Sequence, residues 1–369
     1  MATELENKTR RLSEFCDRHG LDGVLLTLRS NFAWITCGCD NHIANNTPVG
    51  VASILATKDG KRICFANAIE SPRMRDEELS ATGIETITFP WHDGAAGQKA
   101  VKEVIGGRKI ASDSEAFGLK VPPLPGEFNA MRWELTAEEI ARYRDGAGRA
   151  SRAMENACKS LRRGMTEHDA AAALDLEIHR AGMTPLVTLV ASDDRIRKFR
   201  HPIPKQKSMQ NLVMLVTCAE HHGLISCLTR LVSFSKLTDE QTARHQTICN
   251  IDAAVNLATK PGRTLGEVFD VLAEAYHDAG HVDEWKNHHQ GGSCGYQPRD
   301  VVATPGSGVR VVENQGFAWN PSVPGAKSED TVLCTSRGIE VLTAHSKDWP
   351  TVVGKSKDGE LPRAGILVV

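Results

Sequence analysis

Apolar and polar residues alternate over short stretches in the first third of the chain, between segments with helical spacing. Glu4–His19 has the pattern of a polar-faced helix. Apolar runs follow at Asp22–Leu28 and Val49–Ala56, and a turn at Lys58-Asp-Gly-Lys61 leads into Arg62-Ile-Cys-Phe-Ala66. An Asp-Gly pair between apolar runs is a strong signal for a β-hairpin. Strands mixed with helices therefore predict an α/β domain at the N-terminus.

The pattern changes after the proline-rich stretch Pro122-Pro-Leu-Pro-Gly126, which predicts a linker. Two later segments, Thr136-Ala-Glu-Glu139 and Thr238-Asp-Glu-Gln241, have the spacing of a capping box. In this motif a hydroxyl accepts from the backbone three residues on, and the acidic or amide side chain reaches back. Both segments therefore predict helix starts. We place one domain at residues 1–130 and the other at residues 131–369.

The second domain contains an internal repeat. Gly164-Met-Thr-Glu-His-Asp169 and Gly262-Arg-Thr-Leu-Gly-Glu267 match at a constant offset, and each leads to a helix ending in His-x-Ala-Gly. Each copy predicts a turn, an N-cap, an amphipathic helix and a glycine after the helix end. Two capped helices could look alike by chance, but identities in register favour a duplication. We therefore expect two half-domains related by a pseudo-twofold axis.

Composition adds limits but little chemistry. The chain has 369 residues, 41% of them hydrophobic and 24% charged, with a net charge of −2. That balance favours neither nucleic acid nor a membrane surface as partner. The polar N-terminus predicts no secretory signal, and no apolar run approaches the ~20 residues of a membrane span. The ten cysteines are scattered, which is typical of reduced thiols in a cytoplasmic enzyme.

Several segments resemble, in order, the motifs of the creatinase/aminopeptidase P/prolidase family, whose catalytic domain is called the pita-bread fold. They are Arg132–Gly146, Gly164–Glu167, Phe199-Arg-His-Pro202, Leu224–Arg230, His289-Gln-Gly-Gly292 and Ser328-Glu-Asp-Thr-Val-Leu-Cys-Thr335. The resemblance implies a mixed α/β (α+β) protein: a creatinase-like N-terminal domain and a pita-bread domain with an internal pseudo-twofold duplication.

Metallopeptidases of that family hold two metal ions with two Asp, one His and two Glu. Matching the motifs puts the second Asp at Cys227 and the first at Val216, or at Thr217 with a shift of one residue. The His falls at His289, and the two Glu fall at Asn320 and Glu329. Because most carboxylates are replaced, we expect no dinuclear site and no metal cofactor. A single zinc ion on Cys227, His289 and Glu329 is the weaker alternative.

Creatinase hydrolyses a C–N bond without metal, and its catalytic histidine matches His201. The resemblance therefore implies that His201 is the general acid/base, with Glu329 orienting it and His289 donating a proton or hydrogen bond. An arginine fork can bind a substrate carboxylate. The substrate-binding candidates are Arg200, Arg230, Asn320, Tyr296, Cys227 and Trp319. Arg299 also lies near a motif segment.

The leading interpretation is a metal-independent hydrolase that cleaves a C–N bond of a small polar, carboxylated molecule. One alternative is a prolidase or Xaa-Pro aminopeptidase with an atypical metal site. Others are a lyase that uses the same acid/base groups, and a non-catalytic binding module. The family resemblance further implies a homodimer. We expect a small-molecule substrate, and the charge balance predicts no nucleic-acid or membrane partner.

Overall fold

The computed structural model of the chain describes residues 3–369, which divide into two compact units. The first unit runs to Arg132 and includes Thr136–Glu139, and the second comprises Trp133–Leu135 and Ile140–Val369. The sequence placed the boundary between residues 130 and 131, within the short helix η3 (Gly126–Arg132) near the end of the first unit.

The first unit is built on a five-stranded sheet with the order β4-β3-β2-β1-β5. Its strands are β1 (Gly23–Leu28), β2 (Val49–Thr57), β3 (Arg62–Asn67), β4 (Glu85–Phe89) and β5 (Ile110–Ser112). Its helices are α1 (Glu4–His19), α2 (Arg29–Ile35), α3 (Ser71–Arg73), the π-helical turn η1 (Met74–Glu78), α4 (Gly94–Ile105), and the 3-10 turns η2 (Ala116–Gly118) and η3 (Gly126–Arg132). The predicted α/β domain is confirmed.

Two local predictions in this unit are also confirmed. Helix α1 has the predicted bounds and ends at Gly20, whose φ of 64° lies in the left-handed region that glycine adopts without strain. Strands β2 and β3 pair antiparallel around the Asp59-Gly60 turn. Short polar turns therefore set the order of these strands, as the hydrophobic pattern indicated.

The second unit contains two main sheets, with the orders β18-β8-β7-β6 and β10-β9-β11-β14-β15. Its helices are α5 (Ala137–Ser160), α6 (Glu167–Arg180), α7 (Asp194–Lys198), α8 (Asp239–Ala258), α9 (Leu265–Asp278) and the 3-10 turn η4 (Glu284–Asn287). Its strands are β6 (Thr184–Ser192), β7 (Leu212–His221), β8 (Leu224–Ser233), β9 (Gly291–Ser293), β10 (Val301–Val302), β11 (Gln315–Trp319), β12 (Ser322–Val323), β13 (Ala326–Lys327), β14 (Asp330–Thr335), β15 (Gly338–Val341), β16 (Thr351–Ser356), β17 (Gly359–Ala364) and β18 (Leu367–Val368).

The duplication predicted from the sequence is present in the second unit. Helices α6 and α9 have 14 residues each, and each begins with a complete capping box, at Thr166 and Thr264. The turn before each helix is fixed in the same way, because the amide of Gly164 donates to Met209 O and that of Gly262 to Val311 O, both at 2.9 Å. Each half of the unit therefore repeats one helix–strand arrangement.

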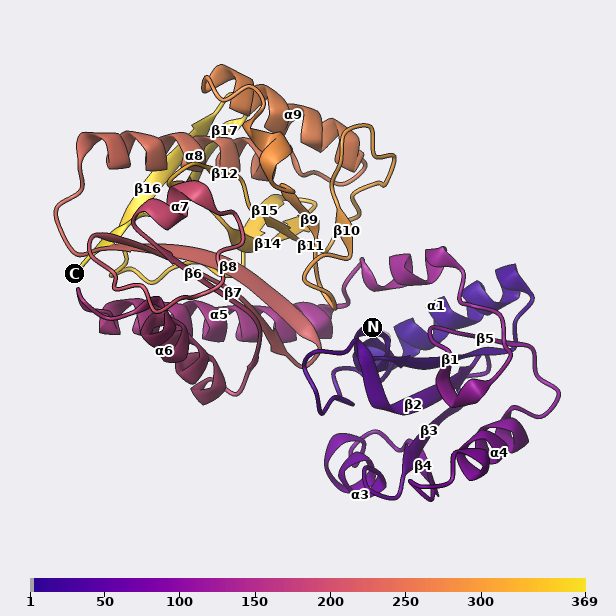
Figure 1. Cartoon of the computed structure of the whole chain (residues 1–369). Helices are drawn as coiled ribbons and strands as arrows, with labels where there is room; N and C mark the ends of the chain where they lie inside the picture. Colours follow the sequence, from indigo (N-terminus) through magenta and orange to yellow (C-terminus); the bar gives the residue numbers. More distant parts are fainter. Residues whose placement is uncertain (1–2) are drawn as a thin grey trace. The chain divides into compact units, whose positions relative to one another are not determined.

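Helices cover one face of each sheet. Residues of α5 and α6 pack with alternate residues of β7 and β8 in one apolar core, and residues of α8 and α9 pack with β11 and β14 in another. In Figure 1 these helix pairs lie on the outer sides of the two sheets. Because side chains alternate along a strand, the remaining residues of β8 and β14 point to the opposite face, which we call the inner face.

The two sheets meet where β8 lies beside β14. The backbone N–H of Thr229 donates to the carbonyl of Glu329 (3.1 Å), and the N–H of Cys227 donates to the hydroxyl of Thr331 (2.7 Å). This junction brings two chain segments about a hundred residues apart into register. The fold therefore places the Ser-x-x-Thr-Arg and Glu-Asp-Thr motifs side by side.

Two expectations from composition concern the whole chain. All ten cysteines are free thiols. Within residues 3–369, no helix has both the length and the apolar character that crossing a membrane requires.

Candidate active site

The motif residues of β8 and β14 divide between the two faces. Thr229 and Glu329 lie on the inner face, where the Thr229 hydroxyl donates to Oε2 of Glu329 (2.7 Å). Their neighbours Arg230 and Asp330 point the other way and form an ion pair of 2.8 Å under the helices. Strand alternation therefore separates two polar networks that are adjacent in sequence.

Glu329 is enclosed by two cations. Its Oε1 accepts from Nη2 of Arg299 (2.9 Å), and its Oε2 lies 2.8 Å from Nζ of Lys327. The glutamate is 3% exposed and Lys327 is 4% exposed. Burial alone would raise the pKa of Glu329, but Lys327 and Arg299 outweigh it and lower the pKa to about 2. Both oxygens of this carboxylate are therefore occupied by side chains of the same chain.

Cys227 stands on the same face beside Arg299. Its Sγ accepts from Nη1 of Arg299 at 3.3 Å. A hydrogen bond from the Cys218 thiol, together with Arg299, lowers the pKa of Cys227 despite burial. The same thiol–thiol hydrogen bond raises the pKa of Cys218. Arg299 therefore bridges the Cys227 thiol and the Glu329 carboxylate.

The β7–β8 ladder shows which residues share the face of Cys227. Across the β7–β8 ladder, the partner of Cys227 is Cys218, whereas Val216 pairs with Thr229 and Thr217 pairs with Leu228. Cross-strand partners share a face. Val216 packs in an apolar cluster of the inner face, and Thr217 points to the face covered by helices. Val216 and Cys218 therefore share the face of Cys227, and the match of Val216 to the family's first aspartate stays a prediction.

The family's dinuclear centre does not fit these residues. Three of the four positions that the family resemblance gives to carboxylates carry Val216 (or Thr217), Cys227 and Asn320 instead. Glu329 keeps its carboxylate, but Arg299 and Lys327 already occupy its oxygens. Hard divalent cations need free anionic oxygens. The arginine and the lysine therefore place two positive charges at the one carboxylate that remains.

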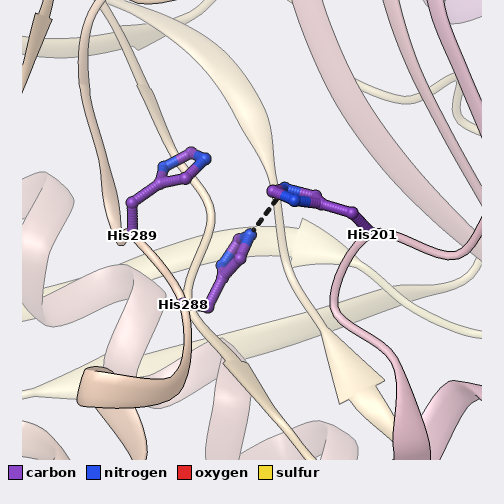
Figure 2. Close-up of side chains that lie close together, drawn as sticks. All are labelled: His201, His288 and His289. Atoms are coloured by element: carbon purple, nitrogen blue, oxygen red, sulfur yellow. Dashed lines mark hydrogen bonds between the residues drawn. The ribbon is translucent and has the colours of Figure 1, made fainter.

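Three histidines gather near this network (Figure 2). His201 follows α7, and His288 and His289 immediately precede β9. Nε2 of His201 and Nε2 of His288 lie 3.0 Å apart and share a hydrogen bond. The ring centroids of His201 and His289 are 5.6 Å apart, and those of His288 and His289 are 4.5 Å apart.

The pKa values of all three imidazoles lie below the ordinary value of histidine. Burial and then Lys327 lower the pKa of His201 below its ordinary value. Burial, with the same lysine and the neighbouring imidazoles, lowers the pKa of His288 to about 2. Burial and Arg299 lower the pKa of His289 to about 4. Neutral imidazoles can accept protons, so the cluster is suited to general base catalysis.

The predicted catalytic residues His201, His289 and Glu329 therefore belong to one neighbourhood, since Glu329 acts on the pKa of both histidines. Asn320 follows Trp319 at the end of β11, with its N–H donating to Gln290 O (3.1 Å). Because Trp319 packs under the helices, alternation directs Asn320 to the inner face. Its catalytic or binding role stays a prediction.

Other substrate-binding candidates have structural partners. Arg230 is 1% exposed and paired with Asp330. Trp319 is fully buried, and its indole donates to Thr259 Oγ1 at 3.0 Å. Neither side chain offers a surface to a substrate here, because both lie on the face covered by helices. The structure therefore assigns both a packing role in place of the predicted contact.

Arg200 and Tyr296 are also engaged. Arg200 forms an ion pair with Glu284, so its charge is already balanced. Tyr296 is 2% exposed, and its hydroxyl accepts from Nη2 of Arg142 at 3.2 Å. Substrate contact by either residue would require one of these bonds to open.

Sequence reasoning missed Lys327 and Cys218 and undervalued His288. Lys327 lies two residues before Glu329, the spacing at which extended chain returns to the same face. Cys218 could have been found from the two-residue turn at His222-Gly223, because that turn fixes the register of β7 against β8. No sequence signal pointed to the bond between His288 and His201, since it joins loops far apart in the chain.

A model of metallopeptidase family M24 matches residues 141–336, more than half of the chain. The chain therefore belongs to family M24. An uncharacterised peptidase from Staphylococcus aureus is 23% identical over 320 residues, covering 80% of this chain and 88% of that protein.

Solved structures agree with the fold. The prolidase from Pyrococcus horikoshii OT3 superposes with a TM-score of 0.76 at 20% identity, covering 92% of this chain and 99% of that one. The Xaa-Pro dipeptidase from Bacillus anthracis gives 0.75 at 18% identity and covers 100% of both chains. The pita-bread fold with its N-terminal domain, expected from the motif series, is thereby confirmed. The chain has an M24 hydrolase fold.

Proposed function

We propose that this protein hydrolyses a C–N bond of a small polar, carboxylated molecule by histidine acid/base catalysis, without the family's dinuclear metal centre. One observation carries the proposal: Arg299 and Lys327 bind both oxygens of Glu329, the carboxylate that the family resemblance gives to the metal site. The three neutral imidazoles beside that network supply the proton transfer that hydrolysis needs. The net positive field of the two cations favours an anionic group on the substrate.

His201 is the general base of this proposal. Its Nε2 and that of His288 share one hydrogen bond, so one ring donates and the other accepts. In the tautomer where His201 donates through Nε2, its Nδ1 is free to take a proton from water. The resulting hydroxide attacks the carbonyl carbon, and the C=O electron pair moves to oxygen. The protonated His201 then gives the proton to the leaving nitrogen as the C–N bond breaks.

His289 and Glu329 support that sequence. A neutral imidazole keeps one N–H, so His289 can donate a hydrogen bond to the developing oxyanion. Glu329 opposes the effect of Lys327 and Arg299 on the histidines, because its charge raises the pKa of each ring. Glu329 therefore holds the two cations in place and limits how far they depress the basicity of His201.

The test combines metal analysis with activity. Protein purified with and without chelator is assayed on a panel of N-acyl, N-carbamoyl and guanidino acids and on Xaa-Pro dipeptides. We expect turnover that survives chelation and falls by about 10²–10⁴-fold in His201→Gln, the usual range for general acid/base catalysis. His277→Gln, on an exposed histidine of α9 (69% exposed), is the matched control. Chelator-sensitive activity would contradict the proposal.

A second candidate is a metallohydrolase with one displaced ion. His201, His288 and His289 each offer a ring nitrogen, and these nitrogens lie within 4.8 Å of one another. Three imidazoles suit zinc, although Lys327 and Arg299 oppose a further cation. One bound ion per chain, lost in His288→Ala together with activity, would favour this candidate over metal-independent hydrolysis.

A further inference from the structure

We propose that the site selects a neutral N–H group, of the ureido or amide kind, and rejects an isosteric guanidinium. The inference rests on the proposed function, which leaves amide, urea and guanidine groups open. It combines two observations: an unpartnered buried acceptor on Asn320, and a Glu329 carboxylate that other cations already hold.

Asn320 supplies the acceptor. Within residues 3–369, its buried Oδ1 has no hydrogen-bond partner, and the residue is 3% exposed. Buried polar atoms are nearly always paired, so an orphaned acceptor on the inner face points to a donor that arrives with a ligand. A carbonyl of this kind accepts an N–H from an amide or a urea. It carries no charge, so it gives a guanidinium no ion pair.

Glu329 leaves no anionic partner for a cation. Each of its oxygens already accepts from a charged side chain, Arg299 at 2.9 Å and Lys327 at 2.8 Å, and Thr229 adds a third donor. A guanidinium near the histidines would meet the positive charges of Arg299 and Lys327. These two cations share the Glu329 carboxylate between them. Like charges brought together at a desolvated site oppose binding strongly.

The electric field of Lys327 and Arg299 disfavours a positive charge on a ligand, as it disfavours the protonated form of a histidine. A carboxylate elsewhere on the ligand is attracted by Lys327 and Arg299, while a positive reacting group is repelled. The arrangement therefore fits an acid with a neutral C–N bond, such as an N-carbamoyl or N-acyl amino acid.

Two probes of nearly equal shape separate the charges. N-carbamoylglycine carries a neutral ureido group, and guanidinoacetate carries a guanidinium on the same skeleton. Binding of each to the full-length protein is measured by calorimetry at pH 7, where no turnover is required. We expect N-carbamoylglycine to bind at least about tenfold more tightly, since like-charge contact opposes the other probe.

Substitutions at Asn320 test whether this residue sets the preference for N-carbamoylglycine over guanidinoacetate. Asn320→Asp supplies the missing anion and should move the preference toward guanidinoacetate by about tenfold or more. Asn320→Leu should weaken N-carbamoylglycine binding. The control Asn211→Asp adds the same charge at an exposed position before β7 and should leave the ratio unchanged.

Tighter or equal binding of guanidinoacetate, no measurable binding of N-carbamoylglycine, or an unchanged ratio in Asn320→Asp would each overturn the inference. Failure of the proposed function gives a different result. In that case N-carbamoylglycine binds in the expected order, but no member of the N-acyl and N-carbamoyl panel is hydrolysed. Binding and turnover therefore test the two proposals separately.

Discussion

Strands β8 and β14 carry one ion network on each of their two faces. The two networks contain similar charges but have different surroundings. On the helix-covered face, Asp330 pairs with Arg230 and Arg363, both at 2.8 Å, and Arg363 also binds Asp252 at 2.6 Å. All four side chains are 4% exposed or less. No ligand can reach this network without unfolding, so its contribution is to the stability of the junction between the sheets.

On the inner face, Glu329 also binds two cations, but these cations act on three histidines. Arg299 and Lys327 each lower the pKa of His201 and His289, and Glu329 raises it. The comparison shows that the alternation of side chains along one strand gives neighbouring residues different roles. Adjacent carboxylates, Glu329 and Asp330, act on a histidine cluster on one face and on the core on the other.

The largest expected effect concerns the helix-covered face. Asp330→Asn leaves Arg230 and Arg363 buried with too little negative charge, which typically costs about 3–5 kcal/mol of unfolding free energy. Urea denaturation at pH 7 measures the loss, with Asp358→Asn in an exposed turn as control. Histidine pKa values in the folded variant should stay unchanged. If the histidine pKa values changed in Asp330→Asn and stability fell only slightly, the two faces would not have these separate roles.

The next effect depends on pH. The pKa of Glu329 is depressed to about 2 in the folded protein, below its unfolded value, so its stabilisation is present above about pH 4.5 and is lost as pH falls toward 2. The difference in unfolding free energy between wild type and Glu329→Gln should therefore narrow as pH falls from 5 to 3, by roughly 1–2 kcal/mol. A constant difference would show that the pKa of Glu329 is not depressed in the folded protein.

A smaller expected effect distinguishes the cations from Glu329 by the direction in which each shifts the pKa of His201. Lys327→Gln removes a charge that lowers the pKa of His201, so that pKa should rise. Glu329→Gln removes a charge that raises it, so the pKa should fall. Shifts of about half to one pH unit are reasonable for charges at this separation. NMR titration of labelled histidines measures both. Shifts in the same direction would contradict the electrostatic account.

Much of the fold could be predicted because its signals are local. The capping boxes at Thr166 and Thr264 and the Asp59-Gly60 hairpin follow from spacing alone, and the structure contains them as expected. The duplication was visible for the same reason, since each repeat is one contiguous helix–strand unit.

The site was only partly predictable because its contacts are long-range. His201 and Glu329 stood in recognisable motifs, whereas the bond between His201 and His288 joins residues 87 positions apart. Cys218 was missed because counting residues does not show which residue of β7 pairs with Cys227. Trp319 was misjudged because proximity to a motif says nothing about which face a side chain takes.

The smallest expected effect comes from an ion pair of good geometry at the surface. Arg144 binds Glu340 through two hydrogen bonds of 2.7 and 2.8 Å, yet both side chains are more than a third exposed. Water and salt screen such pairs, so Arg144→Ala should cost about 0.2–1 kcal/mol, and less in 1 M salt. Asp330→Asn, measured in the same urea series, should keep most of its cost at high salt because the buried pair is not screened. If high salt reduced the loss of unfolding free energy equally in Arg144→Ala and Asp330→Asn, burial would not explain the difference between the two networks and an ordinary surface ion pair.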